Sequence, residues 1–152
     1  MIINKRTQEN RLSQKIKVLP NFTFKSLDNH LITPDSISSD RNTIIMLYSS
    51  DCLHCYNIFD QMVNLISEMP TFQILMVSSD SLETISEFKE KFDLDPGMPI
   101  KFYQCDKAEL AKLFGHYNYP TLYYYDQGKH LIKKITQNID ADNLRVLIKS
   151  GN

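Results

Sequence analysis

The chain has 152 residues, with 17 Lys and Arg against 18 Asp and Glu, and 42% of its residues are hydrophobic. This length excludes two large domains, and the net charge of -1 provides no overall field that would attract nucleic acid or an anionic membrane. No apolar run is long enough for a membrane span. We expect a polar N-terminal segment over residues 1–18 and a single domain over residues 19–152. Residues 1–18 contain no apolar stretch typical of a signal peptide. We expect a bacterial-type cell envelope or periplasm if a leader was trimmed, and the cytoplasm otherwise, so the compartment stays open.

The first elements are predicted from short alternating and apolar runs. Residues 19–24 alternate and are followed by a turn at 26–29 and a second short strand at 30–32, which together predict a hairpin. Residues 43–48 (TIIMLY) form an apolar run of strand length, typical of a parallel strand that is buried on both faces. The apolar spacing that follows predicts an amphipathic helix over about residues 52–68.

The second half of the chain continues this alternation of strands and helices. Strands are predicted at residues 72–77, 100–104, 121–125 and 130–135, and helices from 82 to about 94, at 108–114 and after the cap at 140–143. Successive residues of a strand face opposite sides, so Tyr124 is expected to pack against a different layer from Tyr123 and Tyr125. Together these elements predict an α/β fold in which helices flank a central mixed sheet.

Cys52 and Cys55 carry the chemistry suggested by the sequence. They belong to a Cys-x-x-Cys pattern at the point where the apolar strand 43–48 passes into a helix, and a spacing of three residues brings two helical sulfurs close enough to bridge. The free N–H groups at a helix N-terminus stabilise a thiolate, so Cys52 is the predicted nucleophile and Cys55 the resolving thiol.

Two neighbours are expected to tune this pair in opposite directions. A protonated His54 would stabilise the Cys52 thiolate and make the pair more oxidising, whereas the Asp51 carboxylate would repel the thiolate. The sum of these effects does not follow from the sequence.

The Cys-x-x-Cys pattern after a buried strand, and Tyr119-Pro120-Thr121 before a later strand, resemble the thioredoxin superfamily. The resemblance implies a thioredoxin-like fold in which Pro120 is cis and lies beside the cysteines, and in which the backbone of Tyr119 binds an extended substrate. An N-terminal hairpin and an inserted helix-strand unit over residues 81–104 resemble the TlpA-like branch of thiol-disulfide oxidoreductases. The resemblance implies protein thiols or disulfides as substrates and a redox partner protein. No organic cofactor or metal is implied, because the cysteines carry the electrons.

The sequence departs from this family at three positions, one of which is Asp60, where a helix-kinking Pro is common. Asp51 stands where a Trp is usual, and Met46 stands where thioredoxin itself has a buried acid. Reductant and oxidant therefore stay equally open, and so does the alternative that the chain is a redox-inactive binding module. Neither the oligomeric state nor the physiological partner is indicated.

Other cysteine chemistry is less well supported. A zinc site would require Cys105 and a histidine, His54 or His116, to converge on the cysteine pair. Peroxidase chemistry of the peroxiredoxin type would favour a Pro where Ile45 stands. We expect Cys105 to be a small buried side chain, with a third redox thiol as the alternative.

Overall fold

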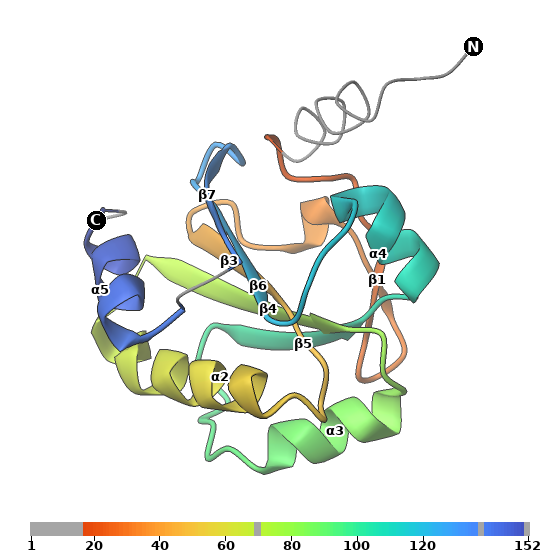
Figure 1. The fold of residues 1–152 in the computed structure, drawn as a ribbon. Helices are drawn as coiled ribbons and strands as arrows, with labels where there is room; N and C mark the ends of the chain where they lie inside the picture. Colours follow the sequence, from red (N-terminus) through yellow and green to blue (C-terminus); the bar gives the residue numbers. More distant parts are fainter. Residues whose placement is uncertain (1–16, 69–70, 137–138, 151–152) are drawn as a thin grey trace.

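The computed structural model describes residues 17–68, 71–136 and 139–150 (Figure 1). Most of the predicted polar segment 1–18 lies outside these ranges. The strands are β1 (Phe24–Ser26), β2 (Leu31–Ile32), β3 (Asn42–Leu47), β4 (Phe72–Ser78), β5 (Ile100–Gln104), β6 (Thr121–Tyr125) and β7 (Leu131–Ile135). The α-helices are α2 (Leu53–Leu65), α3 (Leu82–Glu90), α4 (Lys107–Phe114) and α5 (Ala141–Ser150), and single 3-10 turns occur at Pro34–Ser36 and Ile66–Glu68.

The seven strands form one mixed sheet in the order β2-β1-β5-β4-β3-β6-β7. The three central strands β3, β4 and β5 are parallel, while β1, β2, β6 and β7 pair antiparallel to their neighbours. The predicted α/β fold with a central mixed sheet is therefore confirmed. Because β3 and β4 run in the same direction, the loops after their carboxyl ends lie at the same end of the sheet.

Two hydrophobic cores cover the two faces of this sheet. Helices α2, α3 and α5 pack on one face, and α4 packs on the other together with Leu19 and Phe22 (Figure 1). Strands β3 and β4 are buried along their whole length, as their apolar runs predict. Tyr124 belongs to the first core whereas Tyr123 and Tyr125 belong to the second, which confirms the predicted alternation.

The predicted N-terminal hairpin is present, because β1 pairs antiparallel with β2, but its first strand begins only at Phe24 and the strand predicted over residues 19–23 is wrong. The Leu19 N–H donates to the Lys129 carbonyl at the turn between β6 and β7, so this segment starts at one side of the sheet and reaches β1 near the other. Phe22 is fully buried and its ring stacks on Phe24 at 4.0 Å. The apolar residues of this segment therefore reflect packing across the second core and not pairing in the sheet.

The helix ends follow local capping. The predicted helix 52–68 is α2 followed by a 3-10 turn, and the predicted helix 82–94 stops earlier, at Glu90. Ser81 caps α3 by accepting the Thr84 N–H at 3.1 Å. Helix α4 ends at Gly115, whose φ of 73° favours glycine.

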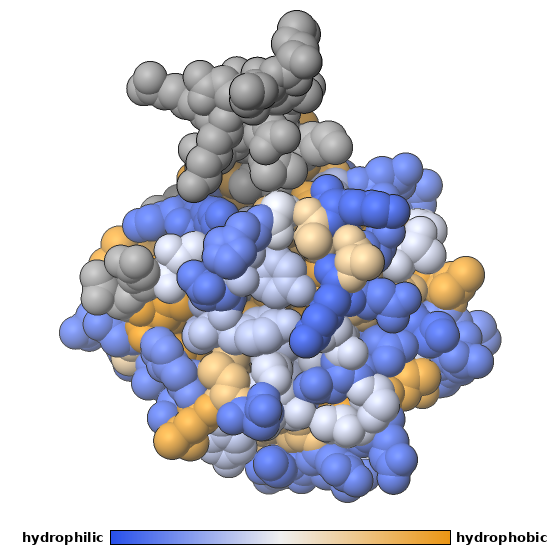
Figure 2. Space-filling model, turned by 45° about the vertical axis from the view of Figure 1, so that its right-hand side comes forward, coloured by the Kyte–Doolittle hydropathy of each residue, from blue (hydrophilic) through white to orange (hydrophobic). Residues whose placement is uncertain are grey.

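No helix within the described ranges has the length and apolar character needed to cross a membrane. The face in Figure 2 is mostly hydrophilic, and its hydrophobic residues lie in small separate areas. A partner that binds this face therefore meets local contacts and not one broad apolar surface.

Candidate redox site

Cys52 is the N-cap residue of helix α2. Its backbone is extended, with φ -90° and ψ 105°, and its Sγ accepts the backbone N–H of Cys55 at 3.1 Å. Its own N–H donates to the Ser49 carbonyl at 3.1 Å, which closes a tight turn after strand β3. The sulfur therefore lies at the positive end of the helix, where free N–H groups favour a thiolate.

A disulfide joins Cys52 to Cys55, whose Cα atoms are 5.2 Å apart. The two residues differ strongly in accessibility: Cys55 is fully buried in the first core, whereas Cys52 is only partly buried. An incoming sulfur therefore meets Cys52 first. The order of attack of the two thiols stays a prediction.

The residues around Cys52 are open to solvent. Leu53 is 75% exposed, and Asp51 and His54 are exposed as well. The Ser49 hydroxyl donates to the Asp51 carboxylate, so this carboxylate is held within the turn. Among the described residues, neither Asp51 nor His54 makes a hydrogen bond to the Cys52 sulfur. Any effect of these two side chains on Cys52 is therefore a through-space charge effect.

Tyr119 and Pro120 lie at the same end of the sheet as Cys52. Their peptide bond is cis, and Thr121, the next residue, pairs with Leu47 at the carboxyl end of β3. Tyr119 and Cys52 both pack at the edge of the first core. The ring centroids of Tyr119 and Tyr117 are 5.6 Å apart in an edge-to-face contact. Burial raises the pKa of Tyr117, and its hydrogen bond with Tyr119 raises it further.

Asp80 is a member of the site that the sequence reasoning missed. It follows strand β4, and its Oδ2 accepts the backbone N–H of Ser50 at 2.9 Å and the Ser50 hydroxyl at 2.7 Å. Partial burial acts to raise the pKa of Asp80, but the hydrogen bonds from Ser50 and Ser78 outweigh it, and the pKa lies below its ordinary value. The available signal was the pair of polar clusters, 49–51 and 78–81, that follow neighbouring parallel strands.

Cys105 lies away from the redox pair. It is buried in the second core, whereas Cys55 is buried in the first. Burial, together with the charges of Glu109 and Asp106, raises the pKa of Cys105 to about 12. The structure does not bring Cys105 together with Cys52, and within the described ranges no three His, Cys, Asp or Glu residues group as metal ligands.

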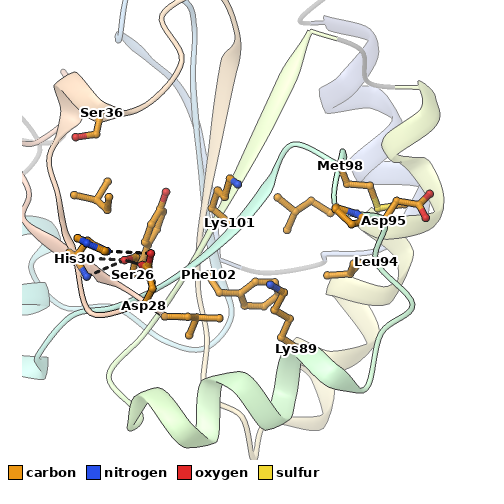
Figure 3. Close-up of a pocket in the computed structure, with 15 residues that line it drawn as sticks. Ser26, Asp28, His30, Ser36, Lys89, Leu94, Asp95, Met98, Lys101 and Phe102 are labelled. Atoms are coloured by element: carbon orange, nitrogen blue, oxygen red, sulfur yellow. Dashed lines mark hydrogen bonds and ion pairs between the residues drawn. The ribbon is translucent and has the colours of Figure 1, made fainter.

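A pocket of about 650 Å³ lies at a different place on the sheet (Figure 3). It is bounded by the turn after β1, by Lys89 at the end of α3 and by residues 100–103 of β5, and Figure 3 shows Lys89 next to Phe102. Cys52 lies beyond the carboxyl ends of the parallel strands, whereas this pocket begins at their amino ends. The pocket is therefore separate from the redox site.

Several solved structures share the fold of this chain. A secreted Mycobacterium tuberculosis disulfide oxidoreductase homologous to E. coli DsbE matches with a TM-score of 0.71 and 9% identity, over 90% of this chain and 98% of that chain. MTB dsbF, described in mixed oxidized and reduced forms, matches with a TM-score of 0.71 and 15% identity, over 91% of this chain and 97% of that chain. A thioredoxin-like protein from Aeropyrum pernix matches with a TM-score of 0.72 and 15% identity, over 94% of each chain.

These similarities show a thioredoxin-like fold, and the close cysteine pair within it supports thiol-disulfide redox chemistry. No curated protein matches the sequence. The profile of the AhpC/TSA family matches residues 17–141. The chain therefore belongs to the AhpC/TSA family.

Proposed function

We propose that the chain is a TlpA-like thiol-disulfide oxidoreductase that exchanges disulfides with protein substrates through Cys52 and Cys55. The observation that carries this proposal is the asymmetry of the pair: a partly exposed sulfur caps a helix, and a fully buried cysteine lies three residues later. A nucleophile needs access and a stabilised thiolate, whereas a resolving thiol needs only to reach the first sulfur.

The exchange proceeds in two steps. The Cys52 thiolate attacks one sulfur of a substrate disulfide, which forms a mixed disulfide and releases the other substrate sulfur as a thiolate. The Cys55 thiolate then attacks the Cys52 sulfur, which forms the Cys52–Cys55 disulfide and releases the second substrate thiol. The substrate gains two electrons and the cysteine pair loses two. The same steps run backwards when the pair oxidises a dithiol, and a redox partner protein restores the starting state.

Substrate contacts are proposed on both sides of Cys52. Leu53 offers an exposed apolar side chain next to the sulfur, and Tyr119 lies at the same end of the sheet. We infer that the backbone of Tyr119, next to Pro120, pairs with an extended segment of the substrate. His54 and Asp51 are proposed to tune the pair by charge alone.

Trapping with insulin as a disulfide-bonded protein tests this proposal. We expect Cys55→Ser to accumulate a mixed disulfide with insulin, because the resolving step is removed, and Cys52→Ser to form none. Normal turnover by the Cys52→Ser protein would contradict the assigned roles. A pair that forms no disulfide in any glutathione buffer would instead favour a redox-inactive binding module.

The direction of electron flow is read from the same glutathione equilibrium, measured by alkylation and mass. A potential near the thioredoxin value of about -270 mV identifies a reductant, and one near the DsbA value of about -120 mV identifies an oxidant.

A further inference from the structure

Asp80 joins two loops at the redox end of the sheet. Its carboxylate accepts both donors of Ser50, the backbone N–H at 2.9 Å and the hydroxyl at 2.7 Å. Its own backbone is held as well, because its N–H donates to Ser78 Oγ at 3.1 Å and its carbonyl accepts Gln104 Nε2 at 2.8 Å. Through Asp80, Ser50 is therefore fixed to the ends of strands β4 and β5.

Ser50 lies inside the turn that places the nucleophile. The Cys52 N–H donates to the Ser49 carbonyl at 3.1 Å, so Ser50 occupies the second position of a closed turn whose last residue is Cys52. The same turn carries the Cys52 sulfur, which accepts the N–H of Cys55 at 3.1 Å. We propose that Asp80 is a positioning residue for Cys52 and acts by holding Ser50. This inference rests on the proposed disulfide exchange.

Two substitutions distinguish the effect of the Asp80 hydrogen bonds to Ser50 from the effect of the Asp80 charge on the Cys52 thiol. The Asp80 carboxylate is ionised at neutral pH, because hydrogen bonds from Ser50 and Ser78 and the charge of Lys107 outweigh the effect of partial burial on its pKa. Asp80→Asn removes this charge but keeps an acceptor oxygen for Ser50, whereas Asp80→Ala removes both. Loss of a negative charge lowers the pKa of a nearby thiol. Loss of the capping position raises that pKa, because the thiolate loses its contact with the helix N-terminus.

The test measures the reactivity of Cys52 directly. Reduced protein in a Cys105→Ser background is alkylated with iodoacetamide from pH 4 to pH 9, and insulin turnover is measured in parallel. We expect Asp80→Asn to stay within about threefold of the parent rate at pH 7 because its hydrogen bonds remain. We expect Asp80→Ala to lose about tenfold or more, because small displacements of a reacting group are costly. The apparent pKa of Cys52 rises only in Asp80→Ala. The other titratable groups near Cys52, which are Cys55, Asp51 and His54, are the same in every variant.

Ser50→Ala supplies a second route to the same contact. It removes the hydroxyl bond and keeps the N–H, so we expect part of the loss in Cys52 alkylation, and no further loss when it is added to Asp80→Ala. If Asp80→Ala does not fold, the alkylation rate of Ser50→Ala tests the proposal in its place. Ser81→Ala is the matched control, since it removes the cap of α3 next to Asp80 without a contact to the turn.

Three results would overturn the positioning role. They are parent-like alkylation in Asp80→Ala, equal effects of Asp80→Asn and Asp80→Ala, and a loss of alkylation in Ser81→Ala as large as in Asp80→Ala. If the parent protein exchanges no protein disulfide, the proposed function fails, whereas the alkylation rates still decide the role of Asp80.

Discussion

The sulfur of Cys52 and the backbone N–H of Cys55 lie 3.1 Å apart, so one cysteine caps the helix in which the other is buried. The reactive atom and the cap of α2 are thus the same atom. An N–H that satisfies its hydrogen bond at a sulfur also stabilises negative charge on it. The chemistry and the local stability of α2 are therefore coupled at this position.

The capping role of Cys52 predicts a difference between two variants that both lack the nucleophile. Cys52→Ser keeps a side-chain acceptor at the N-cap, whereas Cys52→Ala removes it. In urea unfolding with a reductant present, we expect Cys52→Ala to be less stable than Cys52→Ser by about 1 kcal/mol. Equal free energies of unfolding for the two variants would show that a side-chain acceptor at position 52 does not stabilise helix α2.

The central strands were predictable because burial on both faces produces a continuous apolar run. Strand β4 and the predicted strand 72–77 differ by one residue, and β6 agrees at both ends. The segment 19–24 was not predictable in the same way. Its apolar residues resemble a strand pattern, but Leu19 and Phe22 pack across a sheet face, and that depends on the path of the chain.

The redox pair and its place at the start of a helix could be predicted from the sequence. The hydrogen bonds between Asp80 and Ser50, which hold the turn before Cys52, could not. The cluster at residues 78–81 consists of three Ser and one Asp, both residue types that cap helices, and only Ser81 caps α3. Asp80 contacts Ser50 because β3 and β4 are adjacent and parallel. Periodicity predicts that two buried strands exist, but it does not predict which strands are neighbours.

Asp51 and His54 are predicted to shift the redox potential in opposite directions. Asp51→Asn removes a negative charge beside Cys52, favours the thiolate and raises the potential. His54→Ala removes a side chain that is positively charged when protonated, and it therefore lowers the potential. Because both side chains are exposed, we expect shifts of only about 10–20 mV.

Glutathione equilibria measured for both variants check these signs. High salt should reduce both shifts, because it screens exposed charges. Asp60→Asn, an exposed position further along α2, is the matched control and should leave the potential unchanged. Shifts of the same sign for Asp51→Asn and His54→Ala would contradict a charge effect.

Cys105 is predicted to be chemically inert in the folded protein. Its side chain is buried, and burial with the charges of Glu109 and Asp106 raises its pKa to about 12, so almost none of it is thiolate at pH 8. We expect alkylation of the reduced native protein to label Cys52 first and Cys105 only after denaturant is added, as read by peptide mass. Cys105→Ser should turn over insulin as the parent does. Rapid labelling of Cys105 in the native state would instead support a third redox thiol.

Alkaline pH is predicted to unfold the protein through its buried phenols. Burial raises the pKa of Tyr48, Tyr123 and Tyr125, whereas in the unfolded chain these groups ionise near pH 10. Above about pH 10 the unfolded state therefore binds fewer protons than the folded state, and stability falls as pH rises. Each group contributes up to about 1.4 kcal/mol per pH unit until its folded form also ionises.

Urea unfolding in a reductant at pH 8, 9, 10 and 11 measures this loss. We expect a nearly constant free energy of unfolding at pH 8 and 9 and a steep decrease from pH 10 to 11. Tyr125→Phe keeps the buried ring and removes one ionising group, so its decrease should be shallower than that of the parent by up to about 1.4 kcal/mol per pH unit. A free energy that stays constant to pH 11 would mean that these phenols ionise in the folded protein as readily as in the unfolded chain.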